Sequence, residues 1–139
     1  MIDEKFSRWA KSFSGCDGGN LRGSYWLCGI EYGGGDTEDS LIFDEVDVPK
    51  FVGMPHWVDR DAFLKYQYNW KAMKVFAALA GKSVSGYTSF FEEHRCFDQD
   101  SEYFKLNLYP IGFKNTSHAS WTEWHSRKTG FATKQEYLD

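Results

Sequence analysis

The chain has 139 residues, of which 42% are hydrophobic and 26% charged, a balance typical of one packed globular domain. The longest apolar run, residues 75–80, is much shorter than the roughly 20 residues of a membrane-spanning helix, and the N-terminus does not resemble a signal peptide, so we expect neither membrane insertion nor secretion. The net charge of −4 argues against general affinity for nucleic-acid phosphates, so we expect direct nucleic-acid binding to be weak or absent.

The first third of the chain predicts a helix, a strand and a long loop. Asp3 is a candidate N-cap for a helix that Gly15 ends. Its buried face is predicted to carry Phe6, Trp9, Ala10 and Phe13. A turn at 18–20 precedes a nearly continuous apolar run at 24–30, the pattern of a strand buried on both faces, in which Cys28 packs as a small apolar residue. Charges, turn residues and prolines over 36–57 predict a long loop.

The middle of the chain predicts one strong helix. It begins at Asp59 or Asp61 and ends at Gly81. Its apolar stripe consists of Phe63, Tyr66, Trp70, Met73, Ala77 and Ala80. The following segment, 83–97, is ambiguous, with a short helix around 90–94 as one interpretation.

The last third predicts a strand and a helix. Alternation over 102–109 predicts the strand, and Pro110 marks its end. Residues 133–136 match the S/T-x-x-E capping box, which predicts that a final helix begins there. The order of elements predicts a single α/β domain over 1–139 with a mostly parallel sheet. Two predicted strands are fewer than the roughly 4 to 6 of a typical sheet, so we expect a partial fold.

Two short motifs carry a resemblance to a known family. Residues 27–35, LCGIEYGGG, place a glycine-rich loop directly after a strand, where glycines let the backbone approach a ligand. Residues 105–111, KLNLYPI, end the later strand with an N-L-x-P sequence. Together they resemble the uracil-DNA glycosylase superfamily, in particular its single-strand-selective branch, over about residues 20–139. The resemblance implies a three-layer α/β fold.

The resemblance also implies a role for each matching residue. Glu31 stands where the family places the residue that positions or activates the attacking water, and Asn107 stands where its asparagine reads the flipped base. Phe43 is a candidate for the ring that stacks on that base, and Tyr32, also near the base, replaces the family's proline. The family's histidine-bearing last motif has no counterpart here, so we expect a truncated version of the fold in which the role of Glu31 is vestigial.

Six acidic residues lie close together in the predicted long loop, without a lysine or arginine among them. They are Asp36, Glu38, Asp39, Asp44, Glu45 and Asp47. Such a run is either a solvated loop or a surface that fits a basic groove. The sequence offers these carboxylates no local counter-ion. If they form a surface that fits a basic groove, they are the residues that bind a partner.

Two functions compete. One is a non-catalytic binding protein on a truncated glycosylase-like scaffold, which inhibits nucleic-acid-processing machinery as DNA-mimic or anti-CRISPR-like inhibitors do. Its partner is a protein with a basic surface, or a second copy in a homodimer, because an incomplete sheet leaves an edge and an apolar face uncovered. The alternative is a base-excision enzyme of the glycosylase type, or a fragment of one. We prefer the binding protein, because the acidic charge and the missing motif both oppose catalysis.

Metal and cofactor chemistry have little support in the sequence. His118 and His125 are seven residues apart, which is poor spacing for a metal site. The three cysteines form no C-x-x-C pair, so we expect no zinc knuckle and no disulfide framework. We therefore expect no metal and no cofactor, and a reducing cytoplasm as the location.

Overall fold

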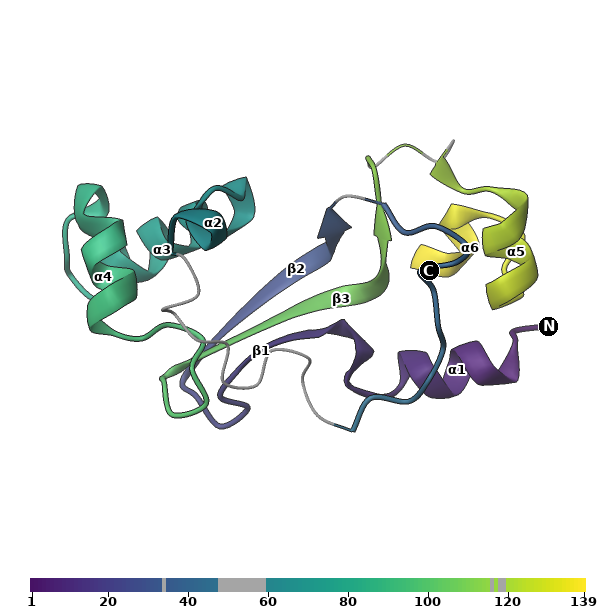
Figure 1. Cartoon of the computed structure of the whole chain (residues 1–139), viewed down its shortest axis with the longest axis horizontal. Helices are drawn as coiled ribbons and strands as arrows, with labels where there is room; N and C mark the ends of the chain where they lie inside the picture. The colour runs from purple at the N-terminus through teal and green to yellow at the C-terminus, as the bar shows by residue number, and fades with distance from the viewer. Residues whose placement is uncertain (34, 48–59, 116, 118–119) are drawn as a thin grey trace. The chain divides into compact units, whose positions relative to one another are not determined.

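A computed structural model describes residues 1–33, 35–47, 60–115, 117 and 120–139 (Figure 1). The chain is a mixed α/β protein with a three-stranded sheet in the order β1-β3-β2. The strands are β1 (Cys16–Gly19), β2 (Tyr25–Gly33) and β3 (Tyr103–Phe113). Two compact units divide the chain. Unit 1 is Met1–Asp17, Cys28–Lys50 and Leu106–Asp139, and unit 2 is Gly18–Leu27 and Phe51–Lys105. That residues 1–139 form one domain stays a prediction.

The sheet is mixed because its two strand pairs differ in direction. At the start of β2, Tyr25 N donates to Glu102 O at 2.9 Å, and after its end Asp36 N donates to Gly112 O at 2.8 Å. Later residues of β2 therefore meet later residues of β3, so β2 and β3 are parallel neighbours. The short strand β1 runs antiparallel to β3, because Asp17 of β1 contacts Asn107 whereas Asn20, just after β1, donates its N–H to the earlier residue Tyr103. A mostly parallel sheet is therefore not what the chain forms, and β1 occupies part of a predicted turn.

Strand β2 lies at an edge of the sheet, with β3 as its one neighbour among the described strands. A strand at the edge has a neighbouring strand on one side only, so more of its surface can contact water. In unit 2, Trp26 is 56% exposed, and in unit 1, Ile30 is 70% exposed and Cys28 is exposed as well. The prediction that this strand is buried on both faces, with Cys28 as a packing residue, is wrong.

Unit 2 is built on helices where the sequence predicts one continuous helix. The structure has α2 (Arg60–Leu64) and α3 (Gln67–Leu79), separated at Lys65 and Tyr66. The Asn69 side chain donates to the Phe63 carbonyl at 2.9 Å, which satisfies a carbonyl that the break leaves open. Gly81 adopts a left-handed φ of 70°, and Lys82 N donates to Ala77 O at 2.8 Å. This Schellman-type ending confirms Gly81 as the end of α3.

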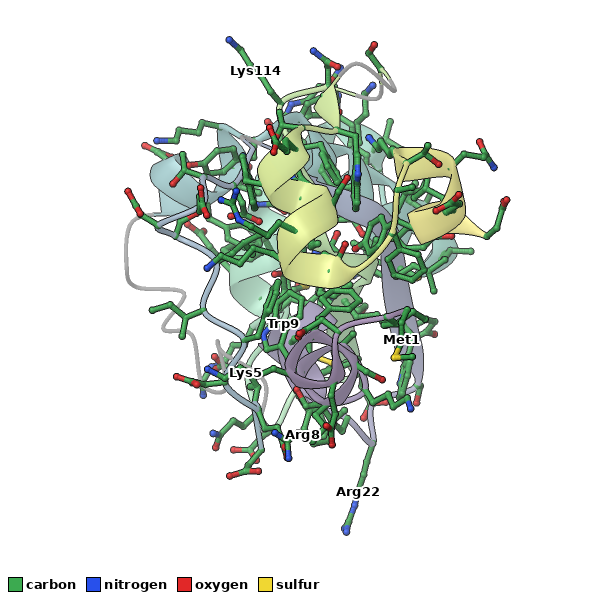
Figure 2. All side chains as sticks on the ribbon, turned by 90° about the vertical axis from the view of Figure 1, so that its right-hand side faces the viewer. Met1, Lys5, Arg8, Trp9, Arg22 and Lys114 are labelled. Carbon is green, nitrogen blue, oxygen red and sulfur yellow. The ribbon has the colours of Figure 1, made fainter. Side chains whose placement is uncertain are left out.

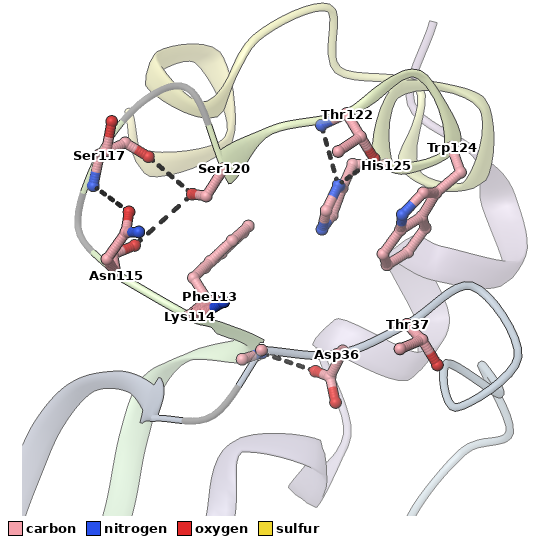
Figure 3. Close-up of a pocket in the computed structure, with 12 residues that line it drawn as sticks. Asp36, Thr37, Phe113, Lys114, Asn115, Ser117, Ser120, Thr122, Trp124 and His125 are labelled. Carbon is pink, nitrogen blue, oxygen red and sulfur yellow. Dashed lines mark hydrogen bonds between the residues drawn. The ribbon is translucent and has the colours of Figure 1, made fainter.

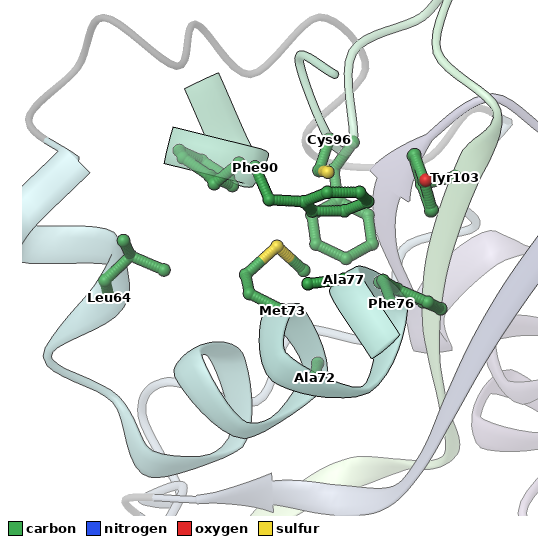
Figure 4. Close-up of a cluster of buried hydrophobic side chains, with 10 residues drawn as sticks. Leu64, Ala72, Met73, Phe76, Ala77, Phe90, Cys96 and Tyr103 are labelled. Atoms are coloured by element: carbon green, nitrogen blue, oxygen red, sulfur yellow. The ribbon is translucent and has the colours of Figure 1, made fainter. Parts of the chain in front are cut away.

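The core of unit 2 forms between α3, α4 (Tyr87–Glu93) and the start of β3 (Figure 4). Helix α4 confirms the short helix predicted in this segment, although it begins earlier. Met73 and Ala77 are completely buried, and Phe90 and Tyr103 pack with them. Burial raises the pKa of the Cys96 thiol to about 12, which keeps this cysteine in its unreactive form.

Unit 1 has a second core beneath α1 (Glu4–Ala10), α5 (Glu123–Thr129) and α6 (Lys134–Leu138). A short 3₁₀ turn, η1 (Phe13–Gly15), follows α1, and a second, η2 (Val84–Gly86), precedes α4 in unit 2. The Asp3 carboxylate accepts from Phe6 N at 2.8 Å, as the predicted cap requires, and Thr133 caps α6 by accepting from Glu136 N at 3.2 Å. Figure 2 shows Trp9 directed from α1 toward α5, with Lys5 and Arg8 on other sides of the helix.

No helix in the described part of the chain is long and apolar enough to cross a membrane. All three cysteines are free thiols.

We predict that Met73→Ala lowers the free energy of unfolding by about 2–5 kcal/mol, because it opens a cavity in a fully buried position of unit 2. Val75→Ala, on the same helix but 54% exposed, is the matched control and should change stability by less than about 0.5 kcal/mol. Urea unfolding measures both. Equal stabilities of the two variants would show that Met73 is not in the core.

Candidate functional site

Asn107 lies within β3, in unit 1, and is buried. Its side-chain amide donates to the Asp17 carboxylate on β1 at 3.2 Å. The prediction that the strand ends at Pro110 is wrong, because β3 continues to Phe113.

The other residues of the resemblance do not assemble into a described site. Glu31 and Tyr32 belong to β2, and their side chains lie outside the described part of the structure. Phe43 is buried in the core of unit 1, with its ring 4.8 Å from Trp9 and 5.2 Å from Phe6. This packing leaves the ring no open face for a base. The structure therefore gives Phe43 a core role in place of the base-stacking role suggested by the resemblance.

The acidic segment has counter-ions that the local sequence does not reveal. Glu38 is paired with Arg127 on α5, at the short end of the ion-pair range. Asp44 lies 3.9 Å from Lys5, and Glu45 lies 3.6 Å from Arg8 on α1. The expectation of six carboxylates without a local counter-ion is therefore wrong for these three. All three pairs are solvent-exposed, so each contributes little to stability.

Asp36, Asp39 and Asp47 differ in their surroundings. Asp36 is partly buried, and its carboxylate accepts from Gly112 N at 2.6 Å. Asp39 and Asp47 are exposed. Asp39 and Asp47 are therefore the exposed carboxylates of this segment for which the structure describes no ion pair.

An exposed apolar row follows the edge strand in unit 1. The register that places Tyr25 opposite Tyr103 also places Ile30 opposite Leu108, and these side chains are 70% and 62% exposed. Exposed Cys28 lies two residues before Ile30, so alternation puts it on the same face. Adjacent exposed apolar side chains on an unpaired edge are a typical protein-binding feature.

A pocket of about 460 Å³ opens in unit 1 beyond the end of β3 (Figure 3). Phe113 and Trp124 give it aromatic walls, and Asp36, Thr37 and His125 are among its polar residues. Figure 3 shows the His125 ring extending from α5 into this space, with Asp36 on the opposite side. The C-terminal ends of strands are where α/β proteins commonly bind ligands.

His125 owes its position to a variant of the capping box. It occupies the third position of α5, and its Nδ1 accepts from Thr122 N at 3.0 Å. Glutamate or glutamine usually makes this bond. The ring also stacks on Trp124, with 3.7 Å between centroids, and lies near Trp121 at 4.9 Å. The helix cap and the aromatic packing therefore fix the orientation of the imidazole.

Burial also keeps this imidazole neutral. Desolvation lowers the pKa of His125, Lys134 lowers it further, and Asp36 acts in the opposite direction. The side chain is only 3% exposed, which fits a structural residue. The T-x-x-H spacing before α5 is the signal that could have revealed its fixed orientation. His118 lies outside the described residues.

No group of three or more potential metal ligands occurs among the side chains that the structure describes. Comparisons with family models, curated proteins and solved structures find no match to this chain.

We predict that His125 makes stability depend on pH. Because its folded pKa is lowered, the unfolded chain takes up the proton first as the pH falls below about 6.5, and the free energy of unfolding decreases there by at most about 1.4 kcal/mol per pH unit. His125→Gln keeps an acceptor for Thr122 N and does not titrate. Urea unfolding between about pH 7.5 and 5.5 should show a smaller decrease for this variant. Parallel pH profiles would contradict the assignment.

Proposed function

We propose that the chain is a non-catalytic binding protein, built on a three-layer scaffold like that of the uracil-DNA glycosylases, that occupies a basic surface of nucleic-acid-processing machinery. The observation that carries this proposal is the exposed row of Cys28 and Ile30 on β2 and Leu108 on β3, beside the edge of β2 that no described strand pairs with. A partner that covers such an edge gains backbone hydrogen bonds as well as apolar contact.

Electrostatics support a partner of the opposite charge. The chain carries a net charge of −4, and Asp39 and Asp47 present exposed carboxylates in unit 1. Exposed charges of this kind accelerate association with a Lys/Arg-rich surface and select against acidic partners. Apolar contact at β2 then supplies affinity, and the acidic segment supplies orientation. The same edge can pair with a second copy of the chain, which makes a homodimer the other form of this proposal.

A base-excision enzyme is the second candidate. The parallel pairing of β2 and β3 favours it, because this pairing puts the backbone of Glu31 on the strand next to Asn107. The Asn107 amide, however, already donates to Asp17. Uracil release that is lost in Asn107→Ala would favour the enzyme over the binding protein.

The test is inhibition of DNA cleavage by a panel of nucleases that includes restriction endonucleases and RNA-guided nucleases. We expect the chain to inhibit at least one nuclease, and Ile30→Glu to weaken that inhibition about tenfold, because a carboxylate replaces apolar contact at the edge. Asp39→Lys combined with Asp47→Lys should slow association several-fold, most clearly at low salt.

Matched controls separate these effects from general damage. Ile2→Glu places the same change at an exposed isoleucine of unit 1 that is outside both the sheet and the acidic segment. Glu93→Lys with Asp100→Lys makes the same charge change in unit 2. Both controls should inhibit like the original chain. The proposal fails if no nuclease is inhibited and sedimentation shows only a 16.1 kDa species, or if test and control variants behave alike.

A further inference from the structure

The pocket beyond β3 presents a hydrogen-bond donor whose identity the structure fixes. A backbone N–H can only donate, so the bond from Thr122 N makes His125 Nδ1 an acceptor. In the neutral imidazole the proton must then reside on Nε2. The lowered pKa of His125 favours this neutral form.

Nε2 is buried and has no hydrogen-bond partner among the described residues. The whole His125 side chain is only 3% exposed, and its ring extends into the pocket (Figure 3). An unsatisfied buried donor costs roughly 1–3 kcal/mol, and such groups in native proteins usually have a ligand, water or functional role that explains them. An acceptor that enters from the pocket would satisfy this donor.

The surroundings of Nε2 restrict the shape of that acceptor. The ring of Phe113 is stacked 5.3 Å from His125, and Trp124 lines the same pocket. Flat apolar walls favour a planar ligand, because aromatic surfaces gain most from stacked or edge contacts with other rings. The volume of about 460 Å³ accommodates a small aromatic molecule.

Asp36 restricts the charge of the ligand. One of its carboxylate oxygens, Oδ2, is held by Gly112 N at 2.6 Å, which fixes the carboxylate at the wall of the pocket. A carboxylate repels an anionic ligand and attracts a hydrogen-bond donor. A ligand that meets both His125 and Asp36 must therefore carry an acceptor and a donor. Lys114 also lines the pocket, and a ligand without net charge is repelled by neither Asp36 nor Lys114.

We propose that this pocket binds a small neutral aromatic amide, whose carbonyl oxygen accepts from His125 Nε2 and whose N–H donates to the Asp36 carboxylate. An amide places both groups in one plane, which suits the aromatic walls. This site is separate from the partner-binding edge of β2 and does not depend on the function proposed for that edge.

Three probes of nearly equal size test the proposal. Benzamide has both the acceptor and the donor, acetophenone has the acceptor alone, and benzoate replaces the donor with a negative charge. Titrations followed by NMR of the whole chain should show benzamide binding, with acetophenone weaker by about tenfold and benzoate weaker still. The His125 Nε2–H signal of the unaltered chain should shift on addition of benzamide.

Variants locate the binding. His125→Gln retains the helix cap and should weaken benzamide binding at least about fivefold, and Asp36→Asn should reduce the preference for benzamide over acetophenone. His94→Gln is the control, because His94 Nε2 is also buried without a described partner but belongs to unit 2. It should leave binding unchanged.

Several results would overturn the proposal. They are no benzamide binding at about 10 mM, equal binding of benzoate, equal binding of acetophenone, or binding that His125→Gln does not alter. Should His125→Gln fail to fold, an unshifted His125 signal in the unaltered chain would overturn it equally. If a tightly held water occupies the site and the probes cannot displace it, no benzamide binding will be seen.

Discussion

The structure depends on β3, because this one strand contributes to both cores. Its first residues, Tyr103 and Phe104, are buried in unit 2, and its last residues, Ile111 and Phe113, are buried in unit 1. It is also the middle strand, paired with β1 on one side and β2 on the other. The short β1 covers only the first part of β3, and beyond it the Tyr137 hydroxyl accepts from Ile111 N at 3.3 Å. Both apolar ends of β3 are therefore covered by other parts of the chain.

The placement of β3 leaves two surfaces available in unit 1. Among the described strands, the edge without a neighbour is that of β2, where Ile30 is exposed. The pocket opens beyond Phe113, and His125, whose Nε2 has no described partner, extends into it. The two surfaces differ in chemistry. The edge suits a protein partner through apolar contact and backbone pairing, whereas the pocket suits a small polar molecule. This separation is the basis on which we propose a binding protein with a second, small-molecule site.

The sequence predicted features that depend on neighbouring residues. The Asp3 cap, the Gly81 helix end and the Thr133 cap are local, and all three are confirmed. Features set by distant contacts were missed. Gly19, expected in a turn, instead ends β1. A Cβ at this position would lie 2.3 Å from Tyr103 O, so glycine is needed here for the two strands to approach each other. The ion pair of Glu38 with Arg127 likewise joins residues far apart in sequence. The cap of α5 was not predicted, because the usual capping-box pattern has glutamate or glutamine where this helix has His125.

Amide hydrogen exchange along β2, measured by NMR on the monomeric chain, tests most directly whether its outer edge is free. Because Tyr25 N donates toward β3, the amides of Tyr25, Leu27 and Gly29 should exchange slowly, and those of Trp26, Cys28 and Ile30 should exchange fast. The amides of β3 should be the slowest in the sheet. Uniformly slow exchange throughout β2 would show that its outer edge is covered within the chain, and would contradict the account of this strand as an open binding edge.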